Sequence, residues 1–509
     1  MVSRCFSMGI NGMMAFTVEI EADVSSGMPA FELVGLPDTA VKESRDRVKS
    51  AIGNCGFDFP ISRIIMNLAP ANMKKEGPIY DLPLFITILK STSQLKANTD
   101  DCVFLGELSL SGNLRSVKGV LPMAIHAKQE GFKRIFLPRA NCDEAAVVEG
   151  LEVYPADTVF EVLEHLREVN LIEKAIPSQI ASEIAEYDFA DVIGQADAKR
   201  ALEISAGGSH NILLIGPPGS GKSMLAKRIP SILPKMTFDE SIETSKIHSV
   251  AGKLTRTNSL ITTRPFRSPH HNISPNGLAG GGTNPSPGEI SLSHNGVLFL
   301  DEFPEFPKVS LEILRQPIEE GIVTISRVSG TVNFPCNFML VAAMNPCPCG
   351  FFGHPTRTCS CSNTSVRRYL NRISGPLLDR IDLHVEVPAL SYDEIVSDIK
   401  EESSFEIRKR IEKARAIQLE RFEGTGITCN SNIPAEKIKE YVNMSVAGQN
   451  VLSKVFSKLD LSARAYHRIM KVSRTIADIE NSERTEAEHV MECVRYRSLD
   501  RKYWMNELW

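Results

Sequence analysis

The hydrophobic pattern of residues 1–170 is typical of a mixed α/β domain. Short apolar runs at 61–68 and 134–137 are interrupted by glycine and proline, and 121–129 is a helical patch. The following residues, 171–190, have weak periodicity and one proline. We therefore predict a first domain at 1–170 and a linker at 171–190.

Residues 191–390 alternate strand-like and helix-like segments. The runs 212–215, 297–300 and 338–344 are short and almost continuously apolar. Such runs suit strands that are buried on both faces of a parallel sheet. The pattern therefore predicts a second α/β domain at 191–390.

Residues 391–509 are predicted to be helical. Apolar side chains recur at helical spacing, and the segment is rich in Lys, Arg and Glu; the recurring positions are Ala465, Ile469, Val472, Ile476 and Ile479. Six basic residues there could form a basic face or an ordinary solvated surface: Lys454, Lys458, Arg464, Arg468, Lys471 and Arg474.

Composition supports a multidomain protein of the cytoplasm. The 509 residues leave room for about three domains, and 42% of them are hydrophobic. The chain has no membrane-length apolar run and no signal-peptide pattern, so we expect no membrane association. Eleven cysteines without an export signal indicate reduced thiols. The net charge of −5 excludes a globally basic nucleic-acid coat, although a local basic channel remains compatible with it.

A phosphate-binding loop follows the first of the three apolar runs. The pattern G-x-x-x-x-G-K-[ST] is met by Gly216, Pro217, Pro218, Gly219, Ser220, Gly221, Lys222 and Ser223. Glycines let backbone N–H groups surround phosphates, and the next helix adds its positive N-terminus. Lys222 would reach the β- and γ-phosphates of ATP, and Ser223 would bind Mg²⁺.

Polar residues that end the other two apolar runs complete a hydrolytic site. Asp301 would lie beside Mg²⁺, and Glu302 would polarise the attacking water; the alternative is a surface acidic pair. Asn345 could orient the water, or could be a turn residue before a proline. Arg380 lies among acidic neighbours, where a salt bridge is the default and a finger reaching a neighbouring subunit is the alternative.

Two further segments have unusual composition. Ten of the 24 residues at 265–288 are Gly or Pro, which indicates either a disordered loop or a mobile insertion over a site. For the adjacent His270 and His271 a structural or substrate-facing role is favoured over metal binding. Two Cys-x-Cys pairs, nine residues apart, predict a Zn²⁺ site, with His354 as a substitute ligand and four reduced thiols as the alternative; the pairs are Cys347, Cys349, Cys359 and Cys361.

The segment 191–195 before the phosphate loop and the stretch 264–292 resemble the magnesium-chelatase-like group of AAA+ ATPases. The resemblance implies that Ile193 and Gly194 contact adenine, and that 265–288 is a loop facing the channel of a ring. It also implies that 322–334 is a hairpin, that Arg380 is the arginine finger, and that Arg464, or Arg468 in another register, is a second sensor in a helical lid at 391–509.

Over nearly its whole length the chain resembles the YifB/ComM family. Residues 106–112 and 131–138 are similar to the protease domain of Lon. The expected fold class is thus α/β: a P-loop AAA+ parallel-sheet core with a C-terminal helical lid, after an α+β Lon-protease-like (S5-like) domain. Lon-type proteolysis needs a Ser and a Lys, but Ile79 and Leu121 occupy the matching positions, and Lys118 would fit only with a register shift. We therefore predict a proteolytically inactive domain.

The family resemblance implies an ATP-hydrolysing ring motor acting on DNA, a ComM-like helicase or branch-migration factor in DNA uptake and recombination. DNA would be bound without sequence preference, by a homo-oligomer that is expected to be a hexamer. Cationic candidates for phosphate contacts are Arg264, Arg267, Lys308, Arg315 and Arg327. The alternative is a chelatase-type or protein-remodelling ATPase that acts on a protein partner.

Overall fold

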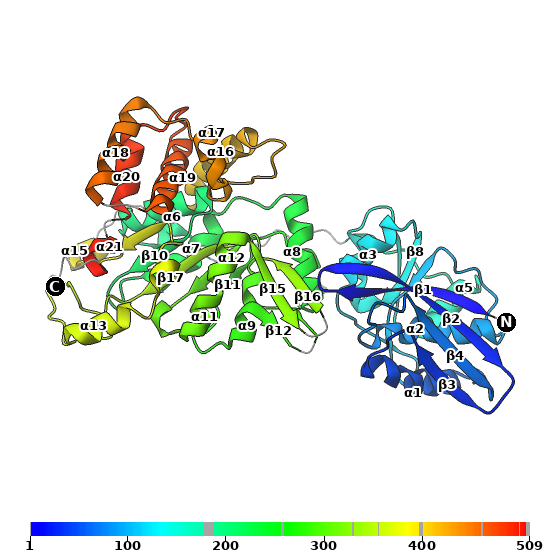
Figure 1. Cartoon of the computed structure of the whole chain (residues 1–509). Coiled ribbons are helices and arrows are strands. Elements are labelled where there is room, and N and C mark those ends of the chain that lie inside the picture. The colour runs from blue at the N-terminus through cyan, green and yellow to red at the C-terminus, as the bar shows by residue number, and fades with distance from the viewer. Residues whose placement is uncertain are drawn as a thin grey trace. The chain divides into compact units, whose positions relative to one another are not determined.

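The chain folds into two compact units (Figure 1). The computed structural model describes residues 2–177, 187–255, 259–282, 284–327, 330–354, 356–396, 401–459, 462–497 and 499–504. Unit 1 comprises 1–181, 238–262 and 326–334, and unit 2 comprises 182–237, 263–325 and 335–509. Residues 178–186 of the predicted linker lie outside the described residues.

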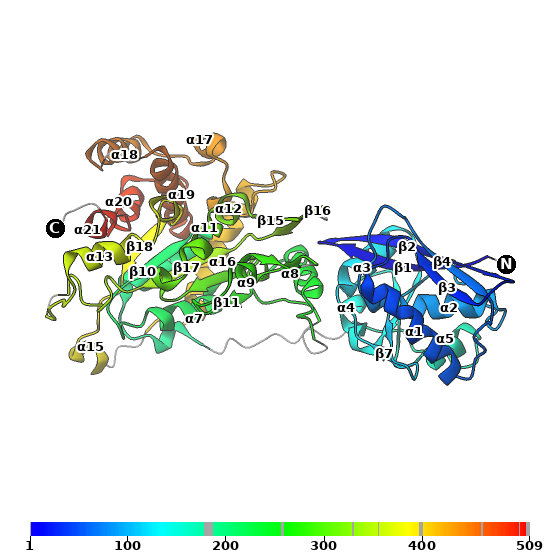
Figure 2. The same ribbon diagram turned by 60° about the horizontal axis from the view of Figure 1, so that its bottom comes forward.

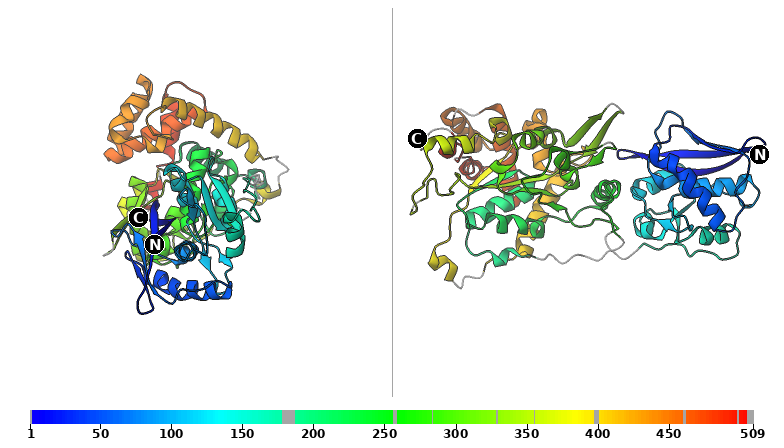
Figure 3. Two further views of the ribbon diagram at one scale, coloured as in Figure 1. Left: turned by 90° about the vertical axis from the view of Figure 1, so that its right-hand side faces the viewer. Right: turned by 90° about the horizontal axis from the view of Figure 1, so that it is seen from below.

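Unit 1 is built on a mixed sheet, which among the described residues has seven strands in the order β3-β4-β2-β1-β5-β8-β9. The hairpin of β1 and β2, dark blue in Figure 3, is antiparallel, and β5, β8 and β9 continue the sheet in parallel from β1. The strands are β1 (Ser3–Asn11), β2 (Met14–Ser25), β3 (Ala30–Val34), β4 (Arg63–Ala69), β5 (Cys102–Phe104), β8 (Arg134–Pro138) and β9 (Glu152–Ala156), and β6 (Glu107–Leu108) pairs with β7 (Leu114–Arg115).

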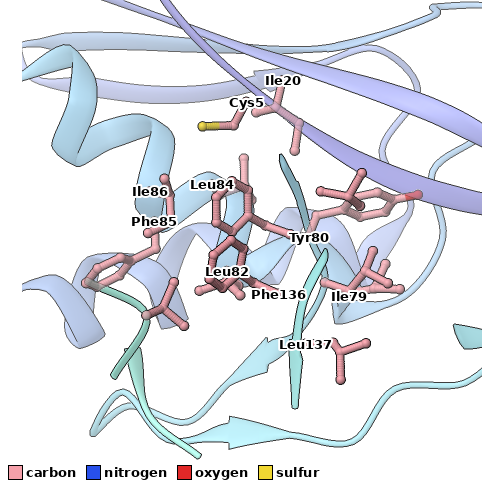
Figure 4. Packing of buried hydrophobic residues seen from close by; sticks show 14 of the residues in the cluster. Cys5, Ile20, Ile79, Tyr80, Leu82, Leu84, Phe85, Ile86, Phe136 and Leu137 are labelled. Carbon is pink, nitrogen blue, oxygen red and sulfur yellow. The ribbon is translucent and has the colours of Figure 1, made fainter. Parts of the chain in front are cut away.

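The core of unit 1 forms where helices cover this sheet. Helix α2 is buried from Asp81 to Leu89, and Figure 4 shows Ile79 and Tyr80 packed in the same apolar cluster. The helices are α1 (Thr39–Asn54), α2 (Asp81–Ser91), α3 (Val120–Gln129), α4 (Cys142–Ala146), α5 (Val159–Leu166) and α8 (Phe238–Val250).

Helix α8 belongs to unit 1, although it follows the phosphate loop in sequence. Its Ser249 carbonyl accepts from the Gly119 N–H at 3.0 Å, and its Ser249 hydroxyl donates to Glu144 at 2.7 Å. Burial raises the pKa of Glu144, and hydrogen bonds from Asn141 and Ser249 offset part of this rise. These long-range contacts could not be read from the helix's own pattern.

Unit 2 contains a parallel sheet, which in the described part of the chain has five strands in the order β11-β14-β17-β10-β18 (Figure 2). Every residue of β10, β14 and β17 is buried, as continuous apolar runs predict for strands covered on both faces. The strands are β10 (Ile212–Ile215), β11 (Phe266–Arg267), β14 (Val297–Leu300), β17 (Met339–Met344) and β18 (Leu383–Glu386).

Helices pack on this sheet and continue into the helical C-terminal part. The sheet helices are α6 (Ala196–Gly208), α7 (Lys222–Ile232), α9 (Pro275–Ala279), α10 (Glu289–Leu292), α11 (Lys308–Ile313), α12 (Arg315–Glu320), α13 (Asn363–Leu370) and α14 (Gly375–Leu378). The C-terminal helices are α15 (Tyr392–Val396), α16 (Ser404–Arg421), α17 (Ile438–Tyr441), α18 (Val446–Leu459), α19 (Ala463–Ile479), α20 (Ala487–Arg495) and α21 (Leu499–Tyr503). None of the described helices has the length and apolarity needed to cross a bilayer.

Helix α19 shows why the C-terminal helices pack as they do. Ser462 caps its first turn by accepting from the Ala465 N–H at 3.2 Å. Its apolar stripe, including Ile469 and Ile476, joins one core with sheet residues such as Val341.

Three of the six residues for which a basic face and a solvated surface were both open are paired inside unit 2. Arg474 is buried and paired with Asp478, Arg468 is paired with Asp382 at 3.3 Å, and Lys471 donates to the Ser431 carbonyl. A buried charge is strongly destabilising without a partner, so these contacts are needed for the packing of unit 2.

The Gly/Pro-rich stretch is more regular than the sequence suggested. Its start is β11, which pairs with β14 at the edge of the central sheet, so this part is not an inserted loop. The rest includes α9 and a short hairpin of β12 (Gly280–Gly281) and β13 (Ser286–Pro287). The predicted hairpin at 322–334 is present as β15 (Ile322–Arg327) and β16 (Gly330–Pro335), with residues 328–329 outside the described set.

Candidate nucleotide-binding site

The phosphate loop joins β10 to α7 at the carboxyl edge of the central sheet. Gly221 precedes α7 with φ 89°, a left-handed conformation that favours glycine. Gly216 has no room for a side chain, because a Cβ there would lie 2.1 Å from the Val387 carbonyl oxygen. The loop is therefore shaped by backbone conformation and close packing, as a cradle for phosphate requires.

Lys222 lies inside this loop and is largely buried. Its Nζ donates to the Gly216 and Pro217 carbonyls at 2.9 and 2.8 Å, and lies 3.3 Å from Asn345 Oδ1. Burial lowers the pKa of Lys222 to about 8, and Asp301 opposes that shift. The lysine is thus within reach of both the loop and the tip of β17.

Oxygen donors suited to Mg²⁺ meet beside the lysine. The Ser223 hydroxyl donates to Asp301 Oδ2 at 2.6 Å, which joins the start of α7 to the end of β14. Hydroxyl and carboxylate oxygens are hard ligands of the kind that Mg²⁺ takes together with water and phosphate. The donor set therefore fits the predicted magnesium role of Ser223 and Asp301.

Glu302 has an unusual backbone and a partner that the sequence reasoning missed. Its φ of 52° is positive, a strained conformation that costs about 1–3 kcal/mol for a residue with a side chain. Its carboxylate lies 3.0 Å from Nδ1 of His271, whose ring is tilted against that of His270 with the centroids 4.1 Å apart. The histidine pair therefore has a positioning contact with the predicted catalytic glutamate.

The adenine-side segment is anchored to its surroundings. The Gly194 N–H donates to Glu401 at 2.6 Å, and Gln195 donates to the Pro388 and Ser220 carbonyls at 2.8 and 3.4 Å. The side chain of Gln195 thereby ties this segment to the phosphate loop. Ile193 and Gly194 lie next to that tie, and their adenine contact stays a prediction.

Arg380 and Arg464 meet on one carboxylate. Arg380 Nη2 lies 2.6 Å from a carboxylate oxygen of Glu319, and its Nη1 donates to the Pro376 carbonyl. The Arg380 side chain is only 6% exposed. Arg464 lies 3.6 Å from the other oxygen of Glu319 and remains 58% exposed. Within the chain these arginines therefore contact α12, and their roles toward a nucleotide stay predictions.

Asp382 is the buried partner that holds Arg468. It also lies 3.5 Å from His210 and accepts from the Asn211 N–H at 3.0 Å. Despite burial, the contacts with His210 and Arg468 and the hydrogen bond from Asn211 lower the pKa of Asp382 to about 2.

Replacing Asp382 with Asn should destabilise unit 2 by about 3 kcal/mol, because Arg468 would be left buried without its counter-ion. A carboxyl with a depressed pKa stabilises above its unfolded pKa, so the wild-type advantage should persist at neutral pH and shrink as pH falls from about 4 to about 2. Urea unfolding of both proteins at pH 7 and at about pH 3, inside that window, measures this. Asp197→Asn is the control, because its ion pair with Arg495 is exposed; an equal effect of both changes would contradict the prediction.

The four cysteines converge as the spacing predicted. The Cys347 sulfur lies 3.3 Å from that of Cys349 and 3.7 Å from that of Cys359, and all four sulfurs, with Cys361, lie within 4.8 Å of one another. Tetrahedral Zn–S bonds of about 2.3 Å place sulfurs about 3.8 Å apart. His354 instead accepts from the Thr356 and Arg357 N–H groups. The thiols alone form a group of metal-binding geometry.

A phosphate loop, a magnesium-type donor pair and a polar strand tip on adjacent strands of this parallel sheet define a nucleotide site of the P-loop class. Residues 188–395 match the family model described as magnesium chelatase, subunit ChlI. Models for subunit ChlI of Mg-chelatase and for the ChlI C-terminal part match residues 20–141 and 401–497.

The relatives that match nearly the full chain include two bacterial proteins. Competence protein ComM of Haemophilus influenzae is 44% identical over 507 residues, covering 97% of each chain. Protein YifB of Escherichia coli is 42% identical over 494 residues, covering 96% of each. The chain belongs to the YifB/ComM family of magnesium-chelatase-like AAA+ proteins.

A partial similarity supports the predicted relation to Lon. Lon protease of Methanosarcina barkeri is 29% identical over 170 residues, which is 31% of this chain and 21% of that protease. Together with the parallel sheet and the helical C-terminal part, these matches confirm the predicted fold class.

Proposed function

We propose that the protein hydrolyses ATP with Mg²⁺ at the phosphate loop. The convergence of Lys222, Ser223 and Asp301 at one edge of the sheet carries this proposal. Lys222 would contact the β- and γ-phosphates, and Ser223 and Asp301 would hold Mg²⁺, which when bound would neutralise charge on the phosphates. Glu302 polarises the attacking water, and Asn345 orients it.

The active form in this proposal is a ring of identical chains, with six as the expected number. Arg380 would act on the ATP of a neighbouring subunit and Arg464 on the ATP of its own. Within a single chain, Glu319 pairs with both arginines. In this proposal, ring assembly breaks the pair of Glu319 with Arg380, so that Arg380 can reach the neighbouring ATP.

DNA is the proposed substrate, on which the ring acts as a helicase or branch-migration motor. The support is the full-length similarity to a protein named for competence. Exposed Lys308 and Arg327 are available for phosphate contacts, whereas Arg267 is paired with Glu289 and Arg264 donates to the Pro234 and Asn295 carbonyls. Such contacts would bind DNA without reading its sequence.

The test compares ATP hydrolysis with and without single-stranded and branched DNA. We expect DNA to stimulate the wild type, and we expect Glu302→Gln to be retained on DNA when ATP is bound. A double change of Lys308 and Arg327 to Ala should reduce stimulation more than basal hydrolysis. Neither stimulation nor retention would overturn the DNA proposal.

A second candidate is a chelatase-type or protein-remodelling ATPase acting on a protein partner. The match of three magnesium chelatase models to most of the chain favours it. ATP hydrolysis that is insensitive to every DNA form, but stimulated by a purified protein partner, would support this alternative.

We propose that the four-cysteine group binds structural Zn²⁺. Protein purified without added zinc should contain about one Zn²⁺ per chain, and Cys347→Ser should lose both the metal and stability, because metal binding is coupled to folding of the loop. Metal analysis and thermal unfolding measure this, with Cys142→Ser as the control outside the group. Absence of zinc together with a harmless Cys347→Ser would reject the site.

We propose that the Lon-like part of unit 1 is not a protease and serves in assembly or binding. Ile79 and Leu121, at the positions of the nucleophile and the lysine, are both buried (Figure 4 shows Ile79). Peptide cleavage that depends on ATP, and that is abolished by changing one Ser and one Lys of this unit, would overturn the proposal.

A further inference from the structure

The cysteine group lies on a segment that starts at the nucleotide site. β17 ends at Met344, whose carbonyl accepts from the Gly216 N–H of the phosphate loop at 3.2 Å. The next residue, Asn345, contacts Lys222, and Cys347 follows two residues later. The first thiol is therefore only two residues along the chain from Asn345, which contacts the lysine predicted to bind phosphate.

The same segment then packs against the phosphate loop. Gly350, directly after Cys349, has φ 84°, and a Cβ built there would lie 2.3 and 2.7 Å from Cδ and Cγ of Pro218. Gly353 is a natural comparison: its φ is 74°, but its Cβ would meet nothing closer than Lys502 Cε at 3.8 Å. Glycine at 350 is thus required by a close approach to Pro218 as well as by conformation.

The thiols determine where Gly350 lies. Cys347 is fully buried, its carbonyl accepts from the Gly350 N–H at 3.0 Å, and its sulfur accepts from the Phe352 N–H at 3.3 Å. A metal bound by Cys347 and Cys349 would fix the turn on which Gly350 stands. Ordering the loop costs conformational entropy, and the metal–thiolate bonds would offset that cost. Without the metal, this compensation is lost.

The far end of the segment returns to the hydrolytic side of the site. After Cys361, Ser362 caps α13 by accepting from the Ser365 N–H, and Arg372 then pairs with Glu305 at 2.7 Å. Glu305 belongs to the short turn that directly follows Glu302, and its N–H donates to the Glu302 carbonyl at 2.7 Å. The cysteine segment therefore touches the site at the phosphate loop and next to the catalytic glutamate.

We propose that the metal-loaded cysteine loop is a positioning element of the nucleotide site, which acts through the contact of Gly350 with Pro218. ATP binding then depends on the metal, and loss of zinc switches the site off. This inference rests on the proposed ATP and zinc sites and does not depend on the DNA proposal.

The first experiment measures the affinity of the full-length chain for a fluorescent ATP analogue with Mg²⁺. Gly350→Ala should weaken binding at least about tenfold, since the Cβ displaces Pro218, whereas Gly353→Ala carries the same conformational cost and should have little effect. In a Pro218→Ala background, which removes Cδ and Cγ, adding Gly350→Ala should cost less than about threefold. Double-mutant cycles of this kind isolate the contact between two residues.

The second experiment removes zinc from the wild type with a high-affinity chelator, restores Mg²⁺, and measures the same affinity before and after zinc is returned. We expect a loss of at least about tenfold, reversed by Zn²⁺. Equal costs of Gly350→Ala in both backgrounds, an affinity unaffected by zinc removal, or a purified chain without zinc would each overturn the proposal. If Gly350→Ala fails to fold, the zinc experiment still decides it, and a wild type that binds no ATP would instead refute the proposed ATP site.

Discussion

Glu302→Gln is expected to lower the rate of ATP hydrolysis by about 10²–10⁴-fold, the usual contribution of a positioned general base. Glu302 directly follows Asp301, the predicted Mg²⁺ ligand, and its carboxylate contacts His271 at 3.0 Å. Glutamine keeps the size of the side chain and cannot accept the proton of water. Nucleotide affinity should therefore be retained, because Lys222, Ser223 and Asp301 are unchanged.

The measurements are steady-state phosphate release and equilibrium nucleotide binding. Glu305→Gln is the matched control, since it makes the same change three residues later in a side chain that pairs with Arg372. Loss of nucleotide binding in Glu302→Gln would show that this carboxylate shapes the site instead of activating water. His271→Ala adds a further comparison, because it removes the partner that positions Glu302 while leaving the base in place.

Arg380→Ala has the second large expected effect, about a 10³-fold loss of hydrolysis with ATP binding retained, as for arginine fingers in general. Mixing it with Lys222→Ala should restore part of the activity, because one variant supplies the arginine and the other the intact phosphate loop across a subunit boundary. Hydrolysis by each variant alone and by mixtures at several ratios measures this. Arg495→Ala, in an exposed ion pair, is the control.

The structure also defines the competing explanation for Arg380. Its side chain is buried and paired with Glu319, so its removal could act by destabilising the chain. A large fall in the free energy of unfolding, with normal hydrolysis per folded chain and no rescue on mixing, would assign it a structural ion pair. Unfolding curves of the variant therefore belong to the same experiment.

Much of unit 2 was predictable from local pattern. β10, β14 and β17 lie within a residue of the apolar runs, because four to six consecutive buried positions leave few alternatives to a strand covered on both faces. The polar residues that end those runs then meet by a general rule, since parallel strands bring their carboxyl ends to one edge. The contacts of Lys222 and Ser223 follow from that rule.

Other features had no signal at the sequence level. Strand β11 is only two residues long and lies in a Gly/Pro-rich stretch, so periodicity could not reveal it. For Arg474 neither of the two alternatives, a basic face or a solvated surface, describes the structure, because Arg474 and its partner Asp478 are both buried. Burial against another helix, not the helical pattern, decided which charges face water.

By itself the sequence determined the chemistry of the site: which residues can cradle phosphate, which oxygens can hold Mg²⁺, and which thiols can hold zinc. The phosphate loop and each pair of thiols follow from short motifs, where covalent connection already places the groups close together, and the Mg²⁺ oxygens follow from the rule that parallel strands bring their carboxyl ends to one edge. The tertiary structure alone decided the contacts between distant residues: His271 on Glu302, Glu319 on two arginines, and Gly350 on Pro218. Such contacts depend on how whole elements pack, and no local propensity encodes which partner a side chain meets.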